Sequence, residues 1–339
     1  MLRLTEPLLN GVVTLDDLIG DTSALQCQKG TLSLRGLSVA YWIYSNPTSA
    51  PKPPVVALHG GPSFTHHYML PLKLLALTEG HPVVFYDQAG CGESSRAQAA
   101  NPGENTPWLL TVEYYVEELR ELVAHLGFTG FYVYGNSWGS MLALEFAVSV
   151  TREPMADARL LGLVLEGALC DGAFYIASQW RERISTLPSF TQRLLKQLEA
   201  ERKYDCAAYH TLEHALNAHF VLRLVPHPDC WKDALSGLNR EIYTAMQGAS
   251  EFTFGGVLEN WSITERLSVV DVPTLVMRGE YDTMTEEVHQ LVVDSIRTAQ
   301  PLITIARAGH CKLIDEPQAC CEAVAKFLRG VEAAARAPH

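Results

Sequence analysis

Short runs of apolar residues recur along most of the chain, and glycine or polar residues follow each run. Runs of this length are typical of strands buried on both faces of a sheet. Stretches with apolar residues at helical spacing separate several of them, for example TVEYYVEELRELVAHLG at 111–127. The alternation predicts a mostly parallel central sheet flanked by helices. The apolar runs begin at residues 54, 82, 131, 160, 273 and 302.

The N-terminal part of the chain has a different pattern. Residues 25–44, LQCQKGTLSLRGLSVAYWIY, alternate between apolar and polar positions. Such alternation predicts antiparallel strands, and glycine is a common turn residue, so we expect turns at Gly30 and Gly36.

A second departure lies between the fourth and fifth of the apolar runs. From about residue 171 to residue 262 no buried-strand run occurs, and charged, histidine and aromatic residues recur at helical spacing. We therefore predict a helical cap at 171–262, inserted into a core formed by 1–170 and 263–339.

The charge of the chain argues against two classes of partner. Its 339 residues are 47% hydrophobic and carry a formal net charge of -12. Nucleic acids and anionic membranes bind basic faces, so neither is an expected partner. No uninterrupted apolar run reaches the roughly 18 residues that a membrane span needs. Neither the composition nor the charge indicates an oligomeric state.

The N-terminus and the cysteines predict a cytoplasmic protein. Residues 1–20 contain acidic residues and a proline, and they lack an apolar segment that ends at a small-residue cleavage site. This pattern argues against a secretory signal. Eight cysteines with no CxxC pair are typical of reduced thiols.

The stretch GNSWG places a lone serine, Ser137, midway between Gly135 and Gly139. A strand-like run precedes it and the helix-like run SMLALEFAVSV follows. A sharp strand-to-helix turn of this kind exposes a serine hydroxyl and needs small residues on both sides. We therefore predict that Ser137 is a nucleophile.

A serine hydroxyl needs a base, and the base needs an acid that orients it. Among twelve histidines, His310 is the best candidate, because it follows the last apolar run and a turn glycine. Asp282 ends the preceding run and is the expected acid. Glu166, at the end of another run, and Glu280 are rival acids.

The anion formed when a hydroxyl attacks a carbonyl group needs two backbone N–H donors. We expect one from Trp138, the residue after the nucleophile. The motif HGGP offers the other, because its glycines let bare backbone approach a substrate. Pro62 has no N–H, so Gly61 is the expected donor.

No metal and no cofactor is predicted. His210 and His214 have a spacing found in metal sites, but no carboxylate or cysteine pattern completes a ligand set. Cys91 and Cys311 lie near the candidate motifs, and neither has a free base that would make it a nucleophile.

Together these motifs resemble the α/β-hydrolase superfamily, and more narrowly the proline iminopeptidases and the related tricorn-interacting aminopeptidases. That family carries an HGGPG-type loop, DQ-x-GxGxS, a GxSxGG-type elbow, a helical cap, G-x-(Y/F)-D and a GH pair. The counterparts here are HGGPS (59–63), DQAGCGES (87–94), GNSWGS (135–140), GEYD (279–282) and AGH (308–310). The resemblance spans roughly residues 30 to 330 and implies an α/β-hydrolase fold with an inserted helical cap. It also implies a triad of Ser137, Asp282 and His310, with Gly61 and Trp138 as oxyanion donors.

In the same family, acidic side chains hold the free N-terminal amine of the substrate. The stretch QGASEFTF supplies Glu251 at one such position, in a cap motif of the N-E-F type. A second family position, a Glu directly after the triad Asp, is Thr283 here. Aromatic side chains near the cap are expected to line an apolar pocket, among them Phe64, Trp180 and Tyr281.

The resemblance implies a serine hydrolase that cleaves an amide or peptide bond through an acyl-enzyme. The expected reaction is release of an N-terminal, proline-like or apolar residue from a small peptide or amide. The alternative is an amidase or esterase for a small metabolite without a free amine, with which Thr283 is compatible. A non-catalytic receptor on the same fold is a third hypothesis, and the intact order Ser137, Asp282, His310 argues against it.

Overall fold

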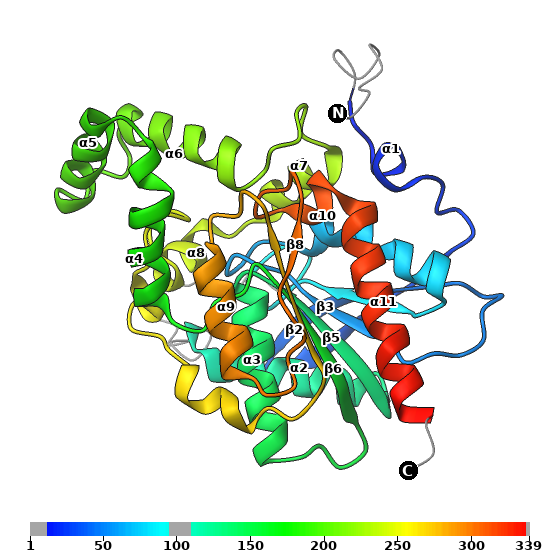
Figure 1. Ribbon diagram of the computed structural model, residues 1–339. Helices are drawn as coiled ribbons and strands as arrows, with labels where there is room; N and C mark the ends of the chain where they lie inside the picture. The colour runs from blue at the N-terminus through cyan, green and yellow to red at the C-terminus, as the bar shows by residue number, and fades with distance from the viewer. Residues whose placement is uncertain (1–11, 95–109, 337–339) are drawn as a thin grey trace.

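The computed structural model describes residues 12–94 and 110–336, and a single sheet of eight strands forms the centre of this part (Figure 1). The strand order is β1-β2-β4-β3-β5-β6-β7-β8. All pairs from β4 to β8 are parallel, and only β1 with β2 and β2 with β4 are antiparallel. The predicted mostly parallel sheet is confirmed. The strands are β1 (Gln26–Leu34), β2 (Leu37–Ser45), β3 (Val55–Leu58), β4 (Val83–Tyr86), β5 (Gly130–Asn136), β6 (Arg159–Glu166), β7 (Thr274–Gly279) and β8 (Ile303–Ile305).

Helices cover both faces of the sheet. The α-helices are α1 (Leu15–Ile19), α2 (Val112–His125), α3 (Trp138–Arg152), α4 (Gly172–Glu182), α5 (Ser189–Ala200), α6 (Ala207–Phe220), α7 (Asp229–Gly237), α8 (Arg240–Met246), α9 (Glu286–Ser295), α10 (Lys312–Asp315) and α11 (Pro317–Arg336). Shorter 3-10 or π segments include η2 (His66–Leu72), η3 (Leu75–Glu79) and η7 (Thr264–Val269). None of these helices has the length and apolar content that crossing a bilayer requires. Residues 1–11, which contributed to the argument against a secretory signal, lie outside the described part.

Alternate residues of the central strands enter two different hydrophobic clusters. On one face, Val56 and Leu58 of β3 belong to a cluster that includes α2, α3 and α9. On the other face, Val55 and Ala57 belong to a cluster that includes η2 and α11. All four residues are fully buried. A strand buried on both faces has no polar alternation, which explains the continuous apolar runs in the sequence.

The first two strands form a hairpin whose turn contains Gly36. The turn predicted at Gly30 is wrong, because β1 runs through this residue without interruption. Gly30 pairs with Tyr41 of β2, and a Cβ at Gly30 would lie only 2.3 Å from the Tyr41 hydroxyl oxygen. The glycine therefore makes room for a ring and does not bend the chain.

Between β6 and β7 the chain forms helices α4 to α8, and the described residues of this segment contain no strand of the sheet. Figure 1 shows α4, α5 and α6 standing to one side of the sheet. This segment has its own small core, which includes Ile184, Leu195 and Phe252. An isolated bridge pairs Asp171 with Ser262, so the two ends of the segment meet.

Candidate active site

Ser137 occupies the sharp turn between β5 and α3. Its backbone angles are φ 56° and ψ -122°, a left-handed conformation that costs energy in a residue with a Cβ. A Cβ on Gly135 would lie 2.3 Å from the carbonyl oxygen of Gly139, and a Cβ on Gly139 would lie 2.0 Å from that of Leu58. Only glycine fits at either flanking position, so the backbone can turn sharply here. The turn holds the Ser137 hydroxyl at the carboxyl edge of the sheet.

His310 and Asp282 approach each other from loops that follow β8 and β7. Nδ1 of His310 lies 2.8 Å from Oδ1 of Asp282, and the same oxygen accepts the N–H of Met284 at 3.0 Å. The backbone N–H of His310 donates to the carbonyl of Phe220 at 2.8 Å. A Cβ at Gly167 would lie 2.5 Å from the imidazole, so the glycine leaves room for this ring.

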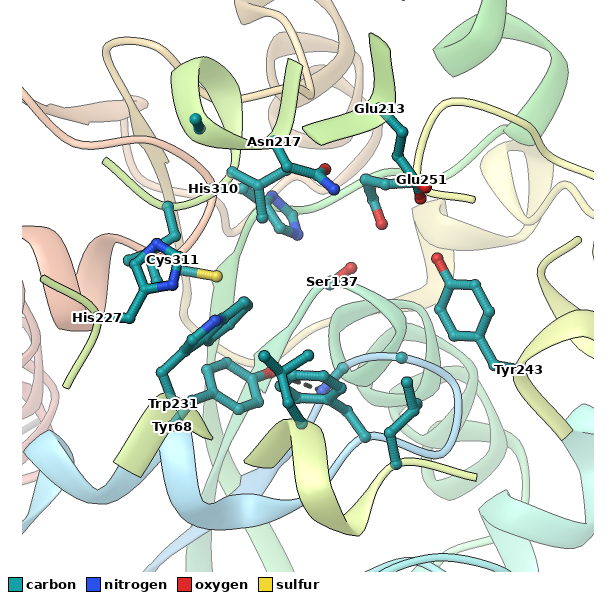
Figure 2. Close-up of a pocket in the computed structure, with 18 of the residues that line it drawn as sticks. Tyr68, Ser137, Glu213, Asn217, His227, Trp231, Tyr243, Glu251, His310 and Cys311 are labelled. Atoms are coloured by element: carbon teal, nitrogen blue, oxygen red, sulfur yellow. Dashed lines mark hydrogen bonds between the residues drawn. The ribbon is translucent and has the colours of Figure 1, made fainter. Parts of the chain in front are cut away.

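The second ring nitrogen of His310 faces the cavity that contains Ser137. Among the described residues, this buried Nε2 has no hydrogen-bond partner. Figure 2 shows the imidazole and the Ser137 side chain directed into the same space. The arrangement leaves a basic nitrogen ready to take a proton from a hydroxyl group.

The charges around this pair favour an ionised acid and a basic imidazole. Burial by itself would raise the pKa of Asp282, but the positive charges of Lys312 and His310 outweigh it and hold this pKa well below 3.8. Burial would lower the pKa of His310, but Asp282 beside the ring raises it above 6.5. Asp282 is therefore a carboxylate at neutral pH, and a protonated His310 is stabilised beside it.

The two rival acids have other partners. The Tyr134 hydroxyl donates a hydrogen bond to Glu166, whose other oxygen lies 3.4 Å from Nζ of Lys312. Glu280 accepts the backbone N–H of Arg307 at 2.8 Å, in an exposed position. The structure pairs His310 with Asp282 and with neither glutamate.

The neighbouring thiols do not form a competing site. Cys311 lines the cavity beside His310, but burial raises the pKa of its thiol well above 9.0, so the thiol stays protonated. The thiol of Cys91 donates to the carbonyl of Gln88 at 3.2 Å. In the part of the chain that the structure describes, no group of three or more His, Cys, Asp or Glu side chains is placed to hold a metal ion.

The loop after β3 passes close to Ser137, because a Cβ on Gly60 would lie only 3.1 Å from the Ser137 Cβ. The N–H of Gly60 donates to the Tyr68 hydroxyl at 2.7 Å, and this hydroxyl donates to the side chain of Asn136. Gly61, the next residue, has φ 121° and also lines the cavity. A Cβ on Gly61 would lie 2.6 Å from a backbone nitrogen, so only glycine fits this bend.

Trp138 is the first residue of α3, where backbone N–H groups have no partner within the helix. Its indole points away from the cavity and donates to Gln88 at 2.8 Å. Trp138 is not among the residues that line the cavity, so its side chain is not expected to contact a substrate there.

A cavity of about 530 Å³ opens beside these groups, and both Ser137 and His310 line it. Much of the cavity wall consists of apolar or aromatic side chains. Some of them belong to the core and others to the segment between β6 and β7. The predicted residue Phe64 is part of this wall. Its neighbours there include Leu222, Val225, Trp231, Leu235 and Leu238.

Two residues predicted to line the pocket lie elsewhere. Trp180 packs within the small core of the helical segment, with Nζ of Lys196 at 4.9 Å from the ring centroid. The guanidinium of Arg223 covers the ring of Tyr281 at 3.9 Å, and His219 packs against its edge. Neither ring lines the cavity, and each packs against a cationic side chain elsewhere in the fold.

Two carboxylates enter the cavity from the segment between β6 and β7. Glu251 lines the wall, and the Tyr175 hydroxyl donates to its Oε1 at 2.8 Å. Glu213, on α6, also lines the cavity, and Figure 2 shows both carboxylates directed toward the space above Ser137. Sequence reasoning missed Glu213. The available signal was the helical spacing of Glu213 and Asn217, which puts both residues on one face of α6.

The residue after Asp282 takes part in a neutral network behind Glu251. Thr283 is fully buried, and its hydroxyl accepts a hydrogen bond from the Gln179 amide at 2.6 Å. The same amide also contacts the Tyr175 hydroxyl. Thr283 thereby supports the tyrosine that holds Glu251, and the second carboxylate of the cavity comes from α6.

Both cavity glutamates have a raised proton affinity. Burial raises the pKa of Glu251, and the charges of Asp282 and Glu213 raise it further, against the opposing effect of His310. Burial also raises the pKa of Glu213. Two carboxylates that line one partly dry cavity favour a cation there, because a cation relieves their repulsion. Glu213 already has one basic neighbour, since Nδ1 of His210 lies 3.7 Å from its Oε2.

Comparisons with known proteins agree with this geometry. The model of the alpha/beta hydrolase fold family matches residues 53–317. A proline iminopeptidase of Lactobacillus helveticus is 30% identical over 85% of this chain and 93% of its own, and one of Thermoplasma volcanium is 29% identical over 86% and 93%. The crystal structure of a proline iminopeptidase of Mycobacterium smegmatis superposes with a TM-score of 0.80, at 28% identity over 91% of this chain and 100% of that one.

Proposed function

The chain belongs to the α/β-hydrolase fold family and, within it, to the proline iminopeptidases, and we propose that it releases an N-terminal residue from a short peptide or amide. Membership of this family makes it a hydrolase, in agreement with the motifs of the sequence. The proposed residue is proline or a small apolar one, and the proposed nucleophile is Ser137. No metal or cofactor takes part in the proposed reaction.

In the proposed reaction, Oγ of Ser137 attacks the carbonyl carbon of the scissile amide while Nε2 of His310 takes the hydroxyl proton. The C–N bond then breaks, and His310 returns the proton to the leaving amine. Water next attacks the acyl-enzyme and gives a proton to His310, and the ester bond to Ser137 breaks as His310 passes that proton to Oγ of the serine. Asp282 keeps Nδ1 of the imidazole protonated, so that Nε2 is the basic nitrogen. The 2.8 Å contact between Asp282 and His310 supports this assignment.

The negative oxygen of each tetrahedral intermediate is assigned to the backbone N–H groups of Gly61 and Trp138. The position of Trp138 at the start of α3 supports this role, because the helix dipole adds partial positive charge there. The N–H of Gly60 is already bound to Tyr68, which supports Gly61 as the second donor.

The substrate ammonium group is assigned to Glu213 and Glu251. This proposal depends above all on one observation: both carboxylates line the same cavity as Ser137 and His310. Hydrogen bonds between an ammonium and a carboxylate are short and strong, and they fix the distance from the amine to the scissile carbonyl. Because the amine site lies within the cavity of the nucleophile, the enzyme would remove one residue from a free N-terminus and would not cut within a chain.

Both proposed amine-binding residues belong to the segment 171–262, which we assign as a cap on a core formed by 1–170 and 263–339. The cap would determine which amine enters, and the core would carry out the bond cleavage. The separate small core of α4 to α6 supports this division. The eight cysteines are free, which supports the proposed cytoplasmic location.

The test compares three substrates with matched leaving groups: a proline arylamide, its N-acetylated form and an aryl ester without an amine. We expect N-acetylation to reduce kcat/KM by at least about a hundredfold, because the neutral amide cannot form the ion pairs. Equal turnover of the free and acetylated arylamides would overturn the aminopeptidase assignment. It would leave the alternative, an amidase or esterase that requires no free amine.

A further inference from the structure

A buried lysine lies behind the Asp282–His310 pair, and the proposed reaction gives it no role. Lys312, the first residue of α10, is fully buried. Its Nζ lies 3.1 Å from Oδ2 of Asp282 and 3.4 Å from Oε1 of Glu166, and it donates to the backbone carbonyl of His310 at 3.0 Å. All three contacts of this ammonium group therefore involve the acid, the base or a second buried carboxylate.

A charge in this position needs an explanation, because taking an ammonium group out of water costs several kcal/mol unless partners compensate it. Two carboxylates compensate it here, and both are fully buried as well. Oδ1 of Asp282 contacts the imidazole, and Oδ2 contacts Lys312. The lysine thus binds the carboxylate on the side opposite to His310 and fixes its orientation.

The positive charge of Lys312 stabilises the ionised acid. Without it, Asp282 and Glu166 would be two buried carboxylates with no permanent cation between them, and the cluster that they form with His310 would take up a proton more readily, on the imidazole. His289 does not replace the lysine, although it lies 4.0 Å from Asp282. Its ring accepts the N–H of Ala168, and burial lowers its pKa to about 4, so it is neutral at physiological pH.

We propose that Lys312 is a positioning residue of the triad: it balances the charge of Glu166 and holds Asp282 as a carboxylate aimed at His310. The inference rests on the proposed function, because it assumes that His310 is the base for Ser137. Lys312 reaches no substrate, since its side chain lies behind Asp282 and does not line the cavity.

A second consequence concerns the pH at which the enzyme becomes active. Several charged or titratable groups face this cluster. They are Glu166 on β6 with its partner Tyr134 on β5, Arg183, whose Nε donates to the Asp282 carbonyl, Tyr175 on α4, His289 on α9, Cys311, Cys320 on α11 and Glu251 of the cavity. Asp282 and Glu251 raise the pKa of His310, and Lys312 opposes them. Removal of the cation should therefore make the imidazole easier to protonate and move the acid limb of the activity profile to higher pH.

The experiment measures the pH dependence of kcat/KM for a proline arylamide in the wild type and in Lys312→Met, Lys312→Gln, Glu166→Gln and the double variant Glu166→Gln/Lys312→Met. Lys312→Gln keeps a donor for the His310 carbonyl but removes the charge. We expect both single lysine variants to shift the acid limb upward by about one pH unit. The double variant should return to within about 0.3 pH units of the wild type, because it removes the carboxylate that the lysine balances.

An unmoved acid limb in both lysine variants would overturn the inference. It would also be overturned if the acid limb of the double variant were displaced from that of the wild type as far as the limb of Lys312→Met. Wild-type behaviour of Lys312→Gln alone would also contradict it, because the hydrogen bond and not the charge would then matter. Thermal unfolding of each variant checks the fold. If Lys312→Met does not fold, the double variant and Lys312→Gln still provide the test. Hydrolysis that survives Ser137→Ala would instead refute the proposed function, whatever Lys312 does.

Discussion

Nδ1 of His310 lies 2.8 Å from Oδ1 of Asp282, although the two residues follow different strands of the sheet. The contact occupies one ring nitrogen and leaves the other, Nε2, facing the cavity of Ser137. A carboxylate in this position determines which nitrogen carries the proton and stabilises the charged ring. In the proposed reaction the hydroxyl, the imidazole and the carboxylate act as one unit, so loss of any member should be costly.

Ser137→Ala should reduce kcat for a proline arylamide by several orders of magnitude, because the bond-forming oxygen is removed. Its melting temperature should stay close to that of the wild type. Cys311→Ala is the matched control, because this thiol lines the same cavity beside His310. The control should keep most of the activity. The opposite pattern, with the cysteine essential and the serine dispensable, would assign the nucleophile to the thiol.

Asp282→Asn should lower kcat by about 10³ to 10⁴ with little change in KM, because an amide favours the wrong tautomer of His310. Glu166→Gln provides the comparison, since this second buried carboxylate does not contact the imidazole. We expect it to lower kcat less than tenfold. Near-normal kcat in Asp282→Asn, with a large loss in Glu166→Gln, would exchange their roles.

Glu213→Gln and Glu251→Gln should each raise KM for a proline arylamide by about tenfold to a hundredfold, because each removes a charged hydrogen-bond acceptor from the ammonium. Hydrolysis of an aryl ester without an amine should change little. Glu241→Gln, on the exposed side of α8, is the control and should behave as the wild type. Equal losses on both kinds of substrate would show that the glutamates support the fold and not the amine.

The activity should rise with pH through the pKa of His310, because only the neutral imidazole can accept the serine proton. Asp282 raises this pKa above 6.5. The midpoint of the acid limb of kcat/KM should therefore lie above 6.5, and stopped assays across pH 5 to 9 would locate it. A midpoint below 6.5 would mean that Asp282 does not stabilise the protonated ring.

Glu118 on α2 should make the free energy of unfolding depend on pH, independently of catalysis. It is fully buried and accepts the N–H of Ala89 at 3.0 Å, and burial raises its pKa from 4.5 to about 8. Between these values the folded state keeps a proton that the unfolded state has lost, so the free energy of unfolding should fall as pH rises. Glu118→Gln should remove this slope and stabilise the protein by about 2 to 3 kcal/mol at pH 7. Urea unfolding at pH 5 and pH 8 measures the difference; parallel behaviour of variant and wild type would contradict the prediction.

Local patterns were sufficient to predict the sheet, because strands buried on both faces need continuous apolar runs. The turn at Ser137 could also be predicted from the sequence, because it requires glycine on both sides. Gly135 lies too close to Gly139, and Gly139 too close to Leu58, for either glycine to carry a side chain. The position of Gly30 within strand β1 could not be predicted from the sequence. A glycine that makes room for a ring on a neighbouring strand looks the same in sequence as a glycine in a turn.

The wall of the cavity was harder to predict than the Asp282–His310 pair. Trp180 and Tyr281 were plausible pocket residues by type, but their cation partners Lys196 and Arg223 come from distant positions that only the tertiary fold brings near. Glu213 was missed for the same reason: on a helix rich in polar residues, the face that meets the cavity depends on how the helix packs. Packing between segments, and not local pattern, decides which side chains meet a substrate.

The proposed nucleophile is tested most directly by identifying the residue that a fluorophosphonate modifies. The protein is titrated with the reagent, residual hydrolysis of a proline arylamide is measured, and the adduct is located by peptide mass spectrometry. We predict a single adduct on Ser137, with hydrolysis lost in proportion to its formation. An adduct on another residue, or hydrolysis that persists when Ser137 is fully modified, would show that Ser137 is not the nucleophile.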